Sequence, residues 1–395
     1  MDGATAQSCD RRATVLPDAP VPLAAPVGAT PGSRIPALDF IRGLCLLVIM
    51  FNHAGSLARK LGYQGRELFT PTMLGYSSAA ELFFFVSGAL IGILYSRPQV
   101  TPAMRLVRLS HRAGHLYLYN ALAYLALLAG CSLLSTPMLE RMELLPMVQA
   151  PARSALQFLV MRDSPPLLDI LALYVGFLLV AIGFVPLARR WPLLALSATL
   201  LLHAVCQWPS ARAALGMEAA GRGMNPFAWQ LPFMLGVLCG QRGLLSRLQA
   251  WMMRPRVAAA VIGALVLMTA GFVLDRKLGP SPEWWWSKHV LGVLRLPHAA
   301  LVLCAYVWLS GVLRDPRMPR AAGWLHEAAA SLGRHSLEVF TASIALTYLG
   351  AVFIGQARLG TLAYYATLAA MALLLWLFSR HLGWRRKAVR SRTLR

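Results

Sequence analysis

The sequence predicts an all-α integral membrane protein, a bundle of about ten transmembrane helices with both termini in the cytoplasm. Apolar residues make up 57% of the 395 residues, and charged residues only 14%. The apolar residues form long blocks instead of the short periodic stripes of soluble helices. These blocks approach or reach the ~20 residues that cross the hydrocarbon core of a bilayer. The composition is therefore that of a membrane protein along most of the chain.

Apolar blocks of suitable length follow one another along the sequence. The predicted spans lie near residues 37–57, 76–96, 112–134, 166–187, 192–208, 226–245, 257–275, 289–313, 331–354 and 361–381. The longest gaps, near 135–165 and 209–225, are too short for a soluble domain. Any chemistry must therefore take place within the bundle or at its rims.

The basic residues determine the predicted orientation. With the amino terminus inside, the cytoplasmic segments hold 23 Lys and Arg residues and the opposite face holds 12. Because cytoplasmic loops are enriched in Lys and Arg, both termini are predicted to face the cytoplasm. The net charge of +22 would also suit a nucleic-acid-binding protein, but there the basic residues gather on one folded face, whereas here they lie between apolar blocks. We therefore expect a lipid bilayer and no nucleic acid as partner.

The two ends of the chain differ from its apolar middle. Residues 1–33 contain acidic residues and several prolines but no apolar core, so we interpret them as a disordered cytoplasmic tail and not as a signal peptide. Residues 34–383 form the predicted membrane domain, and residues 384–395 form a basic cytoplasmic tail. The six cysteines lack metal-binding spacing, and we expect no metal site.

The first predicted span carries three ionisable residues, Asp39, Arg42 and His53. Arg42 and His53 are eleven residues apart, which on an α-helix is about three turns and ~16 Å of rise on one face. Asp39 lies one turn before Arg42 and can pair with its guanidinium, so these two alone could be an interfacial ion pair. Ionisable groups inside lipid are costly and need a partner, a water-filled cavity or a function. A histidine in register with the pair favours function, because imidazole can take and return a proton near neutral pH.

Glu81 enters the second predicted span about one turn from its outer end, at the depth expected for His53. A carboxylate beside a histidine orients the ring and stabilises its imidazolium. Glu81 is therefore the candidate partner of His53. A structural contact with another span is the alternative.

Arg105, Arg108 and Arg112, which we call the basic cluster, follow the second span with helical spacing on the cytoplasmic side. Such a cluster either obeys the positive-inside rule or binds a phosphorylated ligand by charge-assisted hydrogen bonds. The spacing alone favours the first interpretation.

Other polar residues lie at or inside later spans. Asn225 precedes Pro226 and is predicted to cap a helix, with Trp229 and Gln230 facing an external mouth. The tryptophan run at 284–286 is typical of an aromatic belt at the membrane interface, and a sugar-stacking platform is the alternative. The remaining polar candidates are Asp169, Arg295, His298 and Ser336. For each of them, a structural role and a functional role are the two alternatives.

Several of these segments resemble a known family. The run LDFIRGL at residues 38–44, followed by His53, is similar to the first-helix signature of the membrane acyltransferase superfamily, as is the basic segment after the second span. Four further blocks in the same order resemble the OpgC family. They are AAELFFFVSG at 79–88, DILALY at 169–174, NPFAWQ at 225–230 and GRHSLEVF at 333–340. The resemblance covers nearly the whole apolar chain.

The resemblance implies that residues 34–383 form a ten-helix transmembrane acyltransferase domain of the bacterial inner membrane, acting on hydroxyl groups of osmoregulated periplasmic glucans. The implied donor substrate is acyl-coenzyme A, in the first place succinyl-coenzyme A. Because coenzyme A is polyanionic and cytoplasmic, the resemblance gives Arg42 and the basic cluster the role of holding its phosphates, with Asp39 at the same entrance. The resemblance therefore favours phosphate binding by the basic cluster, whereas spacing alone favours the positive-inside rule.

The implied mechanism uses His53, oriented by Glu81, to remove a proton from a glucose hydroxyl while that oxygen attacks the thioester. A buried donor stabilises the oxyanion, with Arg295, His298 and Ser336 as candidates. A covalent acyl-histidine intermediate is the alternative order of steps. The candidates for substrate or oxyanion contacts together are Asp169, Asn225, Trp229, Gln230, Arg295, His298 and Ser336.

Two other functions share these features. The same core could acetylate another cell-envelope polysaccharide, because acyl and acceptor choice depend on pocket shape. A glycan transporter or flippase would have the same hydropathy, but it should contain an inverted repeat with paired broken helices, and we find no such repeat in the sequence. The oligomeric state has no sequence signature.

Overall fold

The computed structural model describes residues 35–217, 223–279, 281–357 and 360–393, and within these ranges it contains helices and loops but no β-strand. Residues Pro36–Arg395 cluster as one compact unit. The predicted disordered tail, 1–33, lies outside the described residues.

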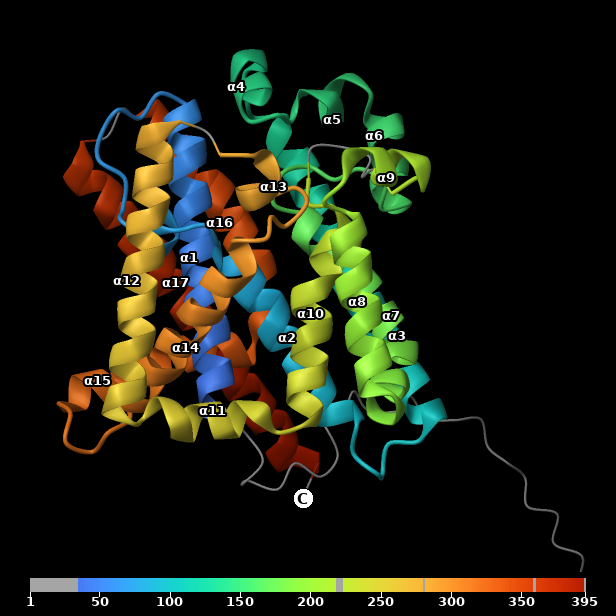
Figure 1. Cartoon of the computed structure of the whole chain (residues 1–395). Helices are drawn as coiled ribbons and strands as arrows, with labels where there is room; N and C mark the ends of the chain where they lie inside the picture. The colour runs from blue at the N-terminus through green and yellow to red at the C-terminus, as the bar shows by residue number, and fades with distance from the viewer. Residues whose placement is uncertain (1–34, 218–222, 280, 358–359, 394–395) are drawn as a thin grey trace, which may run out of the picture. The chain divides into compact units, whose positions relative to one another are not determined.

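Long helices run side by side along the bundle, and short helices lie at its two ends (Figure 1). The long helices are α1 (Pro36–Lys60), α2 (Ala79–Tyr95), α3 (Pro102–Cys131), α7 (Asp169–Arg190), α8 (Pro192–Val205), α10 (Pro226–Gln241), α12 (Pro255–Leu278), α14 (Arg295–Leu313), α16 (Ser336–Gln356) and α17 (Thr361–Thr393). One end carries α4 (Thr136–Arg141), α5 (Leu145–Gln149), α6 (Pro151–Leu159), α9 (Pro209–Ala214) and α13 (Glu283–Trp286). The other end carries α11 (Leu244–Met252) and α15 (Arg320–Arg334). The 3₁₀ helix η2 (Pro71–Leu74) lies between α1 and α2.

Six helices of the described chain are long and apolar enough to cross a membrane: α1, α7, α12, α14, α16 and α17. Two shorter apolar helices, α2 and α8, accompany them. The all-α class predicted from the sequence is confirmed, and so is the presence of several helices suited to a bilayer.

The long helices begin and end close to the predicted spans, with three differences. α3 begins at Pro102 and not near 112, because Thr101 caps it: the Thr101 hydroxyl accepts a hydrogen bond from the Met104 N–H at 3.2 Å. The basic cluster is therefore part of the same helix as the third span. The ninth predicted span is broken at His335, which separates α15 from α16, and α17 continues past residue 383 to Thr393.

α2 packs tightly against α10 through glycines on both helices. A Cβ atom on Gly88 would lie 1.9 Å from a carbonyl oxygen of α10, and one on Gly236 would lie 2.0 Å from a carbonyl oxygen of α2. Gly92 and Gly240 repeat the contact one turn further along. Small residues four apart allow such close backbone approach between membrane helices. The contact fixes α2, the helix that carries the second candidate catalytic residue.

α1 is surrounded by other helices and packs against α2, α14, α15 and α16. Its crossing with α15 again uses glycines, since a Cβ on Gly43 would lie 1.8 Å from the Ala329 carbonyl oxygen and one on Gly333 would lie 1.8 Å from the Asp39 carbonyl oxygen. Arg42 is therefore buried among other helices, whereas Ser56, Arg59 and Lys60 near the end of α1 are exposed.

Replacing Gly236 by Ala tests the α2–α10 contact. The added Cβ would meet a backbone oxygen at 2.0 Å, so the helices must move apart, and we expect the free energy of unfolding to fall by about 1–3 kcal/mol. Thermal unfolding of the purified protein in detergent measures this. Gly263→Ala on α12 is the matched control, because nothing lies within 4 Å of its Cβ and alanine is the better helix former. A Gly236→Ala protein with an unchanged melting temperature would contradict the packing.

Candidate functional site

His53 lies on α1 and faces a small cavity between α1, α7 and α16. The cavity measures about 10 Å³, room for about one water molecule. Its polar lining consists of His53, Ser343 and Thr347. The apolar lining consists of Ile49, Met50, Leu167, Ile170, Phe340 and Ile344. His53 makes no hydrogen bond to another described residue, so its ring nitrogens are available to a ligand.

The two hydroxyl groups beside His53 already donate their protons to α16 itself. Ser343 donates to the Phe340 carbonyl oxygen at 2.7 Å, and Thr347 donates to the Ser343 carbonyl oxygen at 2.7 Å. Their oxygens remain acceptors. Both therefore suit a ring N–H of His53.

Arg42 lies at the other end of the polar stripe of α1. It is 6% exposed, its Nη2 donates to the Ser336 hydroxyl on α16, and its Nε has no hydrogen-bond partner among the described residues. Ser336 and Thr347 are eleven residues apart, as are Arg42 and His53. α1 and α16 therefore run parallel with polar residues facing each other at both places. The prediction that Arg42 and His53 share a face is confirmed, and Asp39 attracts Arg42 electrostatically.

Arg112 of the basic cluster lies near Arg42. Nη2 of Arg112 donates to the Tyr174 hydroxyl on α7 at 3.1 Å, and Nε of Arg105 reaches the Tyr95 carbonyl oxygen at 3.5 Å. Arg42 and Arg112 repel each other, and both lie within electrostatic range of Tyr174. Neither forms a salt bridge with a carboxylate of the described residues. The site therefore holds two guanidinium groups positioned by neutral partners.

Aromatic rings fill the space between the two ends of the stripe. Phe340 lines the histidine cavity and lies one turn after Ser336 on α16. Its ring stacks on Phe83 of α2 with the centroids 5.8 Å apart, and Phe83 meets Tyr174 edge to face at 6.1 Å. Tyr174 in turn accepts from Arg112. A ligand that reaches both ends must pass these rings.

Glu81 pairs with Arg295 of α14 and not with His53. The Arg295 Nε donates to Oε1 of Glu81 at 2.7 Å in a buried salt bridge. Oε2 accepts from the Ser78 N–H at 2.9 Å and from its hydroxyl at 2.7 Å, because Glu81 closes the capping box of α2. The expected contact between Glu81 and His53 is therefore wrong: the cap and the guanidinium occupy the carboxylate.

Arg295 and His298 both hold loop segments in place. Nη1 of Arg295 donates to the Trp286 carbonyl oxygen at 3.3 Å. Nδ1 of His298 lies 2.7 Å from the Ser77 hydroxyl and accepts from the Ser77 N–H at 3.3 Å. Gly75 packs against the same ring, since a Cβ there would lie 1.9 Å from its Nε2. Of the three candidate oxyanion donors, these two contact loops, and Ser336 contacts Arg42.

The three candidate residues at the start of α10, Asn225, Trp229 and Gln230, make structural contacts. Asn225 caps the helix as predicted, with its Oδ1 accepting from two backbone N–H groups of the first turn at 3.0 and 3.3 Å. The expected position of Trp229 and Gln230 at an external mouth is wrong, because they are 0% and 8% exposed. Trp229 Nε1 donates to the Lys288 carbonyl oxygen at 2.7 Å, and Gln230 Nε2 donates to the Thr199 carbonyl oxygen at 2.9 Å. Trp229 is held inward by the loop before α14 and by Phe84 of α2, and Gln230 is held inward by α8.

Asp169 and a lysine that the sequence analysis did not single out lie near the histidine end. Asp169 is half-buried and accepts from the Ile170 N–H at 3.0 Å. Lys288 is exposed, in the loop before α14, and its charge acts on both His53 and Asp169. A single lysine after a tryptophan run carries no recognisable signal.

Ser343 and Thr347 of α16 were also missed, although their spacing from the candidate Ser336 is a sequence signal for them. Ser336, Ser343 and Thr347 are spaced seven and four apart, which places them on one helical face. The argument from face and spacing that linked Arg42 to His53 on α1 would have found these residues if it had been applied to α16.

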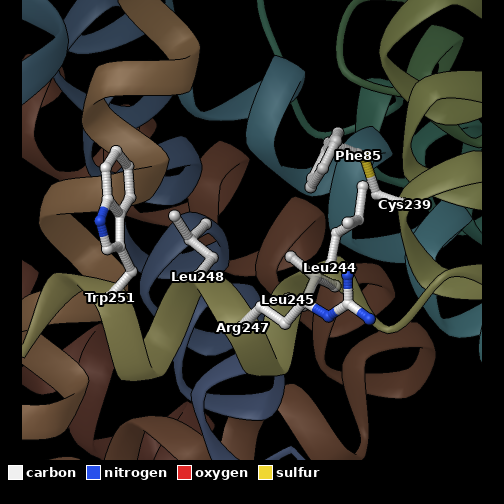
Figure 2. A pocket seen from close by; sticks show the side chains of 7 residues that line it. All are labelled: Phe85, Cys239, Leu244, Leu245, Arg247, Leu248 and Trp251. Carbon is white, nitrogen blue, oxygen red and sulfur yellow. The ribbon is translucent and has the colours of Figure 1, made fainter.

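A larger hollow opens between α2, α10 and α11. It measures about 300 Å³, and its lining is apolar except for Arg247. Figure 2 shows Leu248 and Trp251 projecting from α11, with Phe85 and Cys239 further along the hollow. The hollow has the chemistry of a surface for hydrocarbon chains and shares no lining residue with the histidine cavity. Elsewhere in the described chain, no group of three or more His, Cys, Asp and Glu residues could hold a metal ion.

Comparisons with known proteins agree with the sequence resemblance. The searches of curated proteins and of solved structures found no match. A family model described as OpgC protein matches residues 34–387, which include both ends of the α1 stripe and all the long helices up to the last turns of α17. The match covers nearly the whole chain, and the chain therefore belongs to the OpgC family.

Proposed function

We propose that this protein moves an acyl group, in the first place succinyl, from cytoplasmic acyl-coenzyme A to hydroxyl groups of a periplasmic glucan in the bacterial inner membrane. Membership of the OpgC family implies acyltransferase activity. The observation that carries the choice of donor is the polar stripe of α1. Arginines that form no salt bridge with a described carboxylate lie at one end, and a histidine in a cavity lies at the other.

The path of the chain supports a topology with both termini in the cytoplasm. The start of α1 and the end of α17 lie at the same end of the bundle, together with α11 and α15 (Figure 1). With α2, α3, α8 and α10 added to the six long apolar helices, the chain crosses the membrane about ten times. We assign the shared end to the cytoplasm, because most of the basic residues outside the spans lie there. Arg42 and the basic cluster are then at the cytoplasmic entrance.

The donor phosphates supply an anionic hydrogen-bond partner to Arg42 and Arg112, whose side-chain hydrogen bonds to described residues go to neutral hydroxyl groups. An unpaired guanidinium inside the bundle is costly, and an anion that forms charge-assisted hydrogen bonds with it recovers that cost. Ser336 and Tyr174 already hold the two groups in position, so little side-chain entropy is lost on binding. Arg105 and Arg108 lie earlier on α3, closer to the cytoplasmic end.

The separation of the two ends suits a ligand with an arm. Arg42 and His53 are ~16 Å apart along α1, and the flexible arm of coenzyme A carries its thioester away from the phosphates. The stacked rings of Phe83 and Phe340 lie across this path, so the arm displaces them or passes beside them. With the rings closed, water from the cytoplasm does not reach the thioester.

At the far end, His53 removes the proton from a glucan hydroxyl as the oxygen attacks the thioester carbonyl carbon. The carbon–sulfur bond then breaks, and the coenzyme A thiolate takes the proton from the imidazolium. An acyl-histidine intermediate is the alternative order of steps. The oxygen of Ser343 or Thr347 accepts the other ring N–H and fixes the tautomer. Glu81 is a positioning residue in this scheme and acts through Arg295.

A second function, O-acetylation of another cell-envelope polysaccharide, is favoured by one observation. The cavity beside His53 is small, and no cation is among the residues that line it. A neutral acetyl group needs no counter-charge in such a place.

The first prediction concerns His53. Purified protein given succinyl- or acetyl-coenzyme A and a β-glucan should release free coenzyme A thiol, which a thiol reagent detects. His53→Ala should lower the rate by about 10²–10⁴-fold through loss of the general base. His381→Ala, at an exposed histidine of α17, is the control and should keep the wild-type rate. Absence of thiol release with every acyl-coenzyme A would refute the proposed reaction, and full activity of His53→Ala would refute the role of His53.

The second prediction concerns the donor phosphates. Arg112→Gln and Arg42→Gln should each weaken coenzyme A binding by about ten- to a hundredfold, because each loses a charge-assisted hydrogen bond. Isothermal titration of the purified protein measures the affinity. Arg153→Gln, at an exposed arginine of α6, should bind as the wild type does. Unchanged affinity in both variants would place the phosphates elsewhere.

The third prediction separates a positioning role of Glu81 from direct chemistry. Glu81→Gln and Arg295→Met should each lower the free energy of unfolding by about 3–5 kcal/mol, since each leaves a buried charge unpaired. The double variant should regain much of the stability and much of the activity, which thermal unfolding and thiol release report. A stable but inactive double variant would instead assign one of the two side chains to the reaction itself.

A further inference from the structure

The loop between α13 and α14, residues 287–294, is held in a fixed shape by its own backbone. The Gly292 N–H donates to the Ser287 carbonyl oxygen at 2.8 Å, and the Leu294 N–H donates to the Trp285 carbonyl oxygen at 3.0 Å. Gly292 approaches the backbone so closely that a Cβ there would lie 2.6 Å from the Trp285 carbonyl carbon. We call this segment the anchored loop.

Two other elements bind the anchored loop around Lys288. Trp229 on α10 donates to the Lys288 carbonyl oxygen at 2.7 Å. The Asn225 N–H donates to the His289 carbonyl oxygen at 2.9 Å. Gln207, after α8, donates to the Val290 carbonyl oxygen at 2.9 Å. Three consecutive carbonyl groups are thus fixed, so the position of the Lys288 backbone is fixed as well.

The anchored loop lies beside the start of α7: Nδ1 of His289 lies 2.5 Å from the Gly223 carbonyl oxygen, and a Cβ on Gly223 would lie 3.5 Å from Oδ2 of Asp169. The side chain of Lys288 is exposed, and it forms no salt bridge with a carboxylate of the described residues. Its charge nevertheless acts on His53 and on Asp169. Asp169 begins α7, whose next residue, Ile170, lines the histidine cavity. Lys288 therefore places a positive charge near Asp169, the residue before Ile170 of the cavity lining.

The cavity itself cannot neutralise a carboxylate. Its lining is one imidazole, two hydroxyls that already donate to their own helix, and apolar side chains. A carboxylate placed there without a cation would lose its hydration and gain no ionic partner. A succinyl group differs from a neutral acyl group of the same length by such a carboxylate. Its recognition needs a positive charge within reach of the thioester carbonyl.

We propose that Lys288 binds the terminal carboxylate of the acyl group and so selects an acidic acyl donor over a neutral one. The proposal rests on the function proposed above and adds the residue that determines the acyl class. The thioester carbonyl then lies at His53, where the cavity has room for about one water molecule, and the rest of the acyl chain extends out of the cavity with its carboxylate at the anchored loop. Arg42 and Arg112 cannot take this role, because they lie at the opposite end of the stripe with the coenzyme A phosphates.

The experiment compares two donors of equal length, succinyl-coenzyme A and butyryl-coenzyme A, with a β-glucan as acceptor. Butyryl carries a methyl group where succinyl carries the carboxylate. The ratio of kcat/KM for the two donors should fall by about ten- to a hundredfold in Lys288→Met, which is the loss of one charge-assisted hydrogen bond. Lys288→Arg should retain most of the preference. Lys277→Met, at an exposed lysine near the end of α12, is the matched control and should keep the wild-type ratio.

Each outcome bears on one of the two proposals. No thiol release from the wild type with either donor overturns the proposed function. A wild type that is active but shows the same donor ratio as Lys288→Met overturns the role of Lys288 and leaves the proposed function standing. A wild type that prefers butyryl-coenzyme A, or a Lys288→Met effect confined to the KM for the glucan, overturns it as well.

Discussion

Positive charge inside an apolar bundle is the constraint around which the site is organised. Arg42 is 6% exposed, yet its hydrogen bond goes to a serine, and Arg112 bonds to a tyrosine. Neutral partners orient a guanidinium while leaving its charge available to an anion. Arg295 shows the opposite arrangement, because Glu81 neutralises it inside the protein and the pair joins α2 to α14. In the proposed function, the same residue type therefore serves ligand binding in one place and structure in another, according to its partner.

The position of α1 links that charge to the chemistry. Glycines bring α1 against α15, and the parallel alignment with α16 places Ser336 at Arg42 and Thr347 beside His53. The arginine end and the histidine end are thereby separated by three helical turns with aromatic rings between them. A protein that passes an acyl group through a membrane must not pass water or ions with it. Closely packed rings across the path meet both needs, since they yield to a narrow arm and otherwise keep the path closed.

Features that depend on a few neighbouring residues could be predicted from the sequence, and features that depend on distant partners could not. The spans, the shared face of Arg42 and His53 and the Asn225 cap follow from block length, helical period and local capping. The partner of Glu81 is 214 residues away, and no local pattern reveals it. One local signal was available: Ser78 and Glu81 have capping-box spacing, which already gives that carboxylate a structural partner. The burial of Trp229 depends on Phe84 of α2 and on the anchored loop, so its inward position could not be predicted from α10 alone.

Arg42 is buried and Lys288 is exposed, and this difference affects how easily substitutions could change the acyl group that the protein selects. A buried guanidinium is costly when empty, so the donor end is suited to a phosphate-bearing ligand that every reaction cycle brings. An exposed ammonium stays hydrated when empty, so Lys288 can be kept or lost at little cost to folding. A neutral acyl group gains nothing from it, whereas a carboxylate without it would be stranded beside apolar side chains. A single loop position can therefore change the acyl group without altering Arg42, His53 or the helices that hold them. In the proposed mechanism, selectivity resides at the rim of the bundle, where substitutions are tolerated, and the transfer chemistry resides in its packed interior.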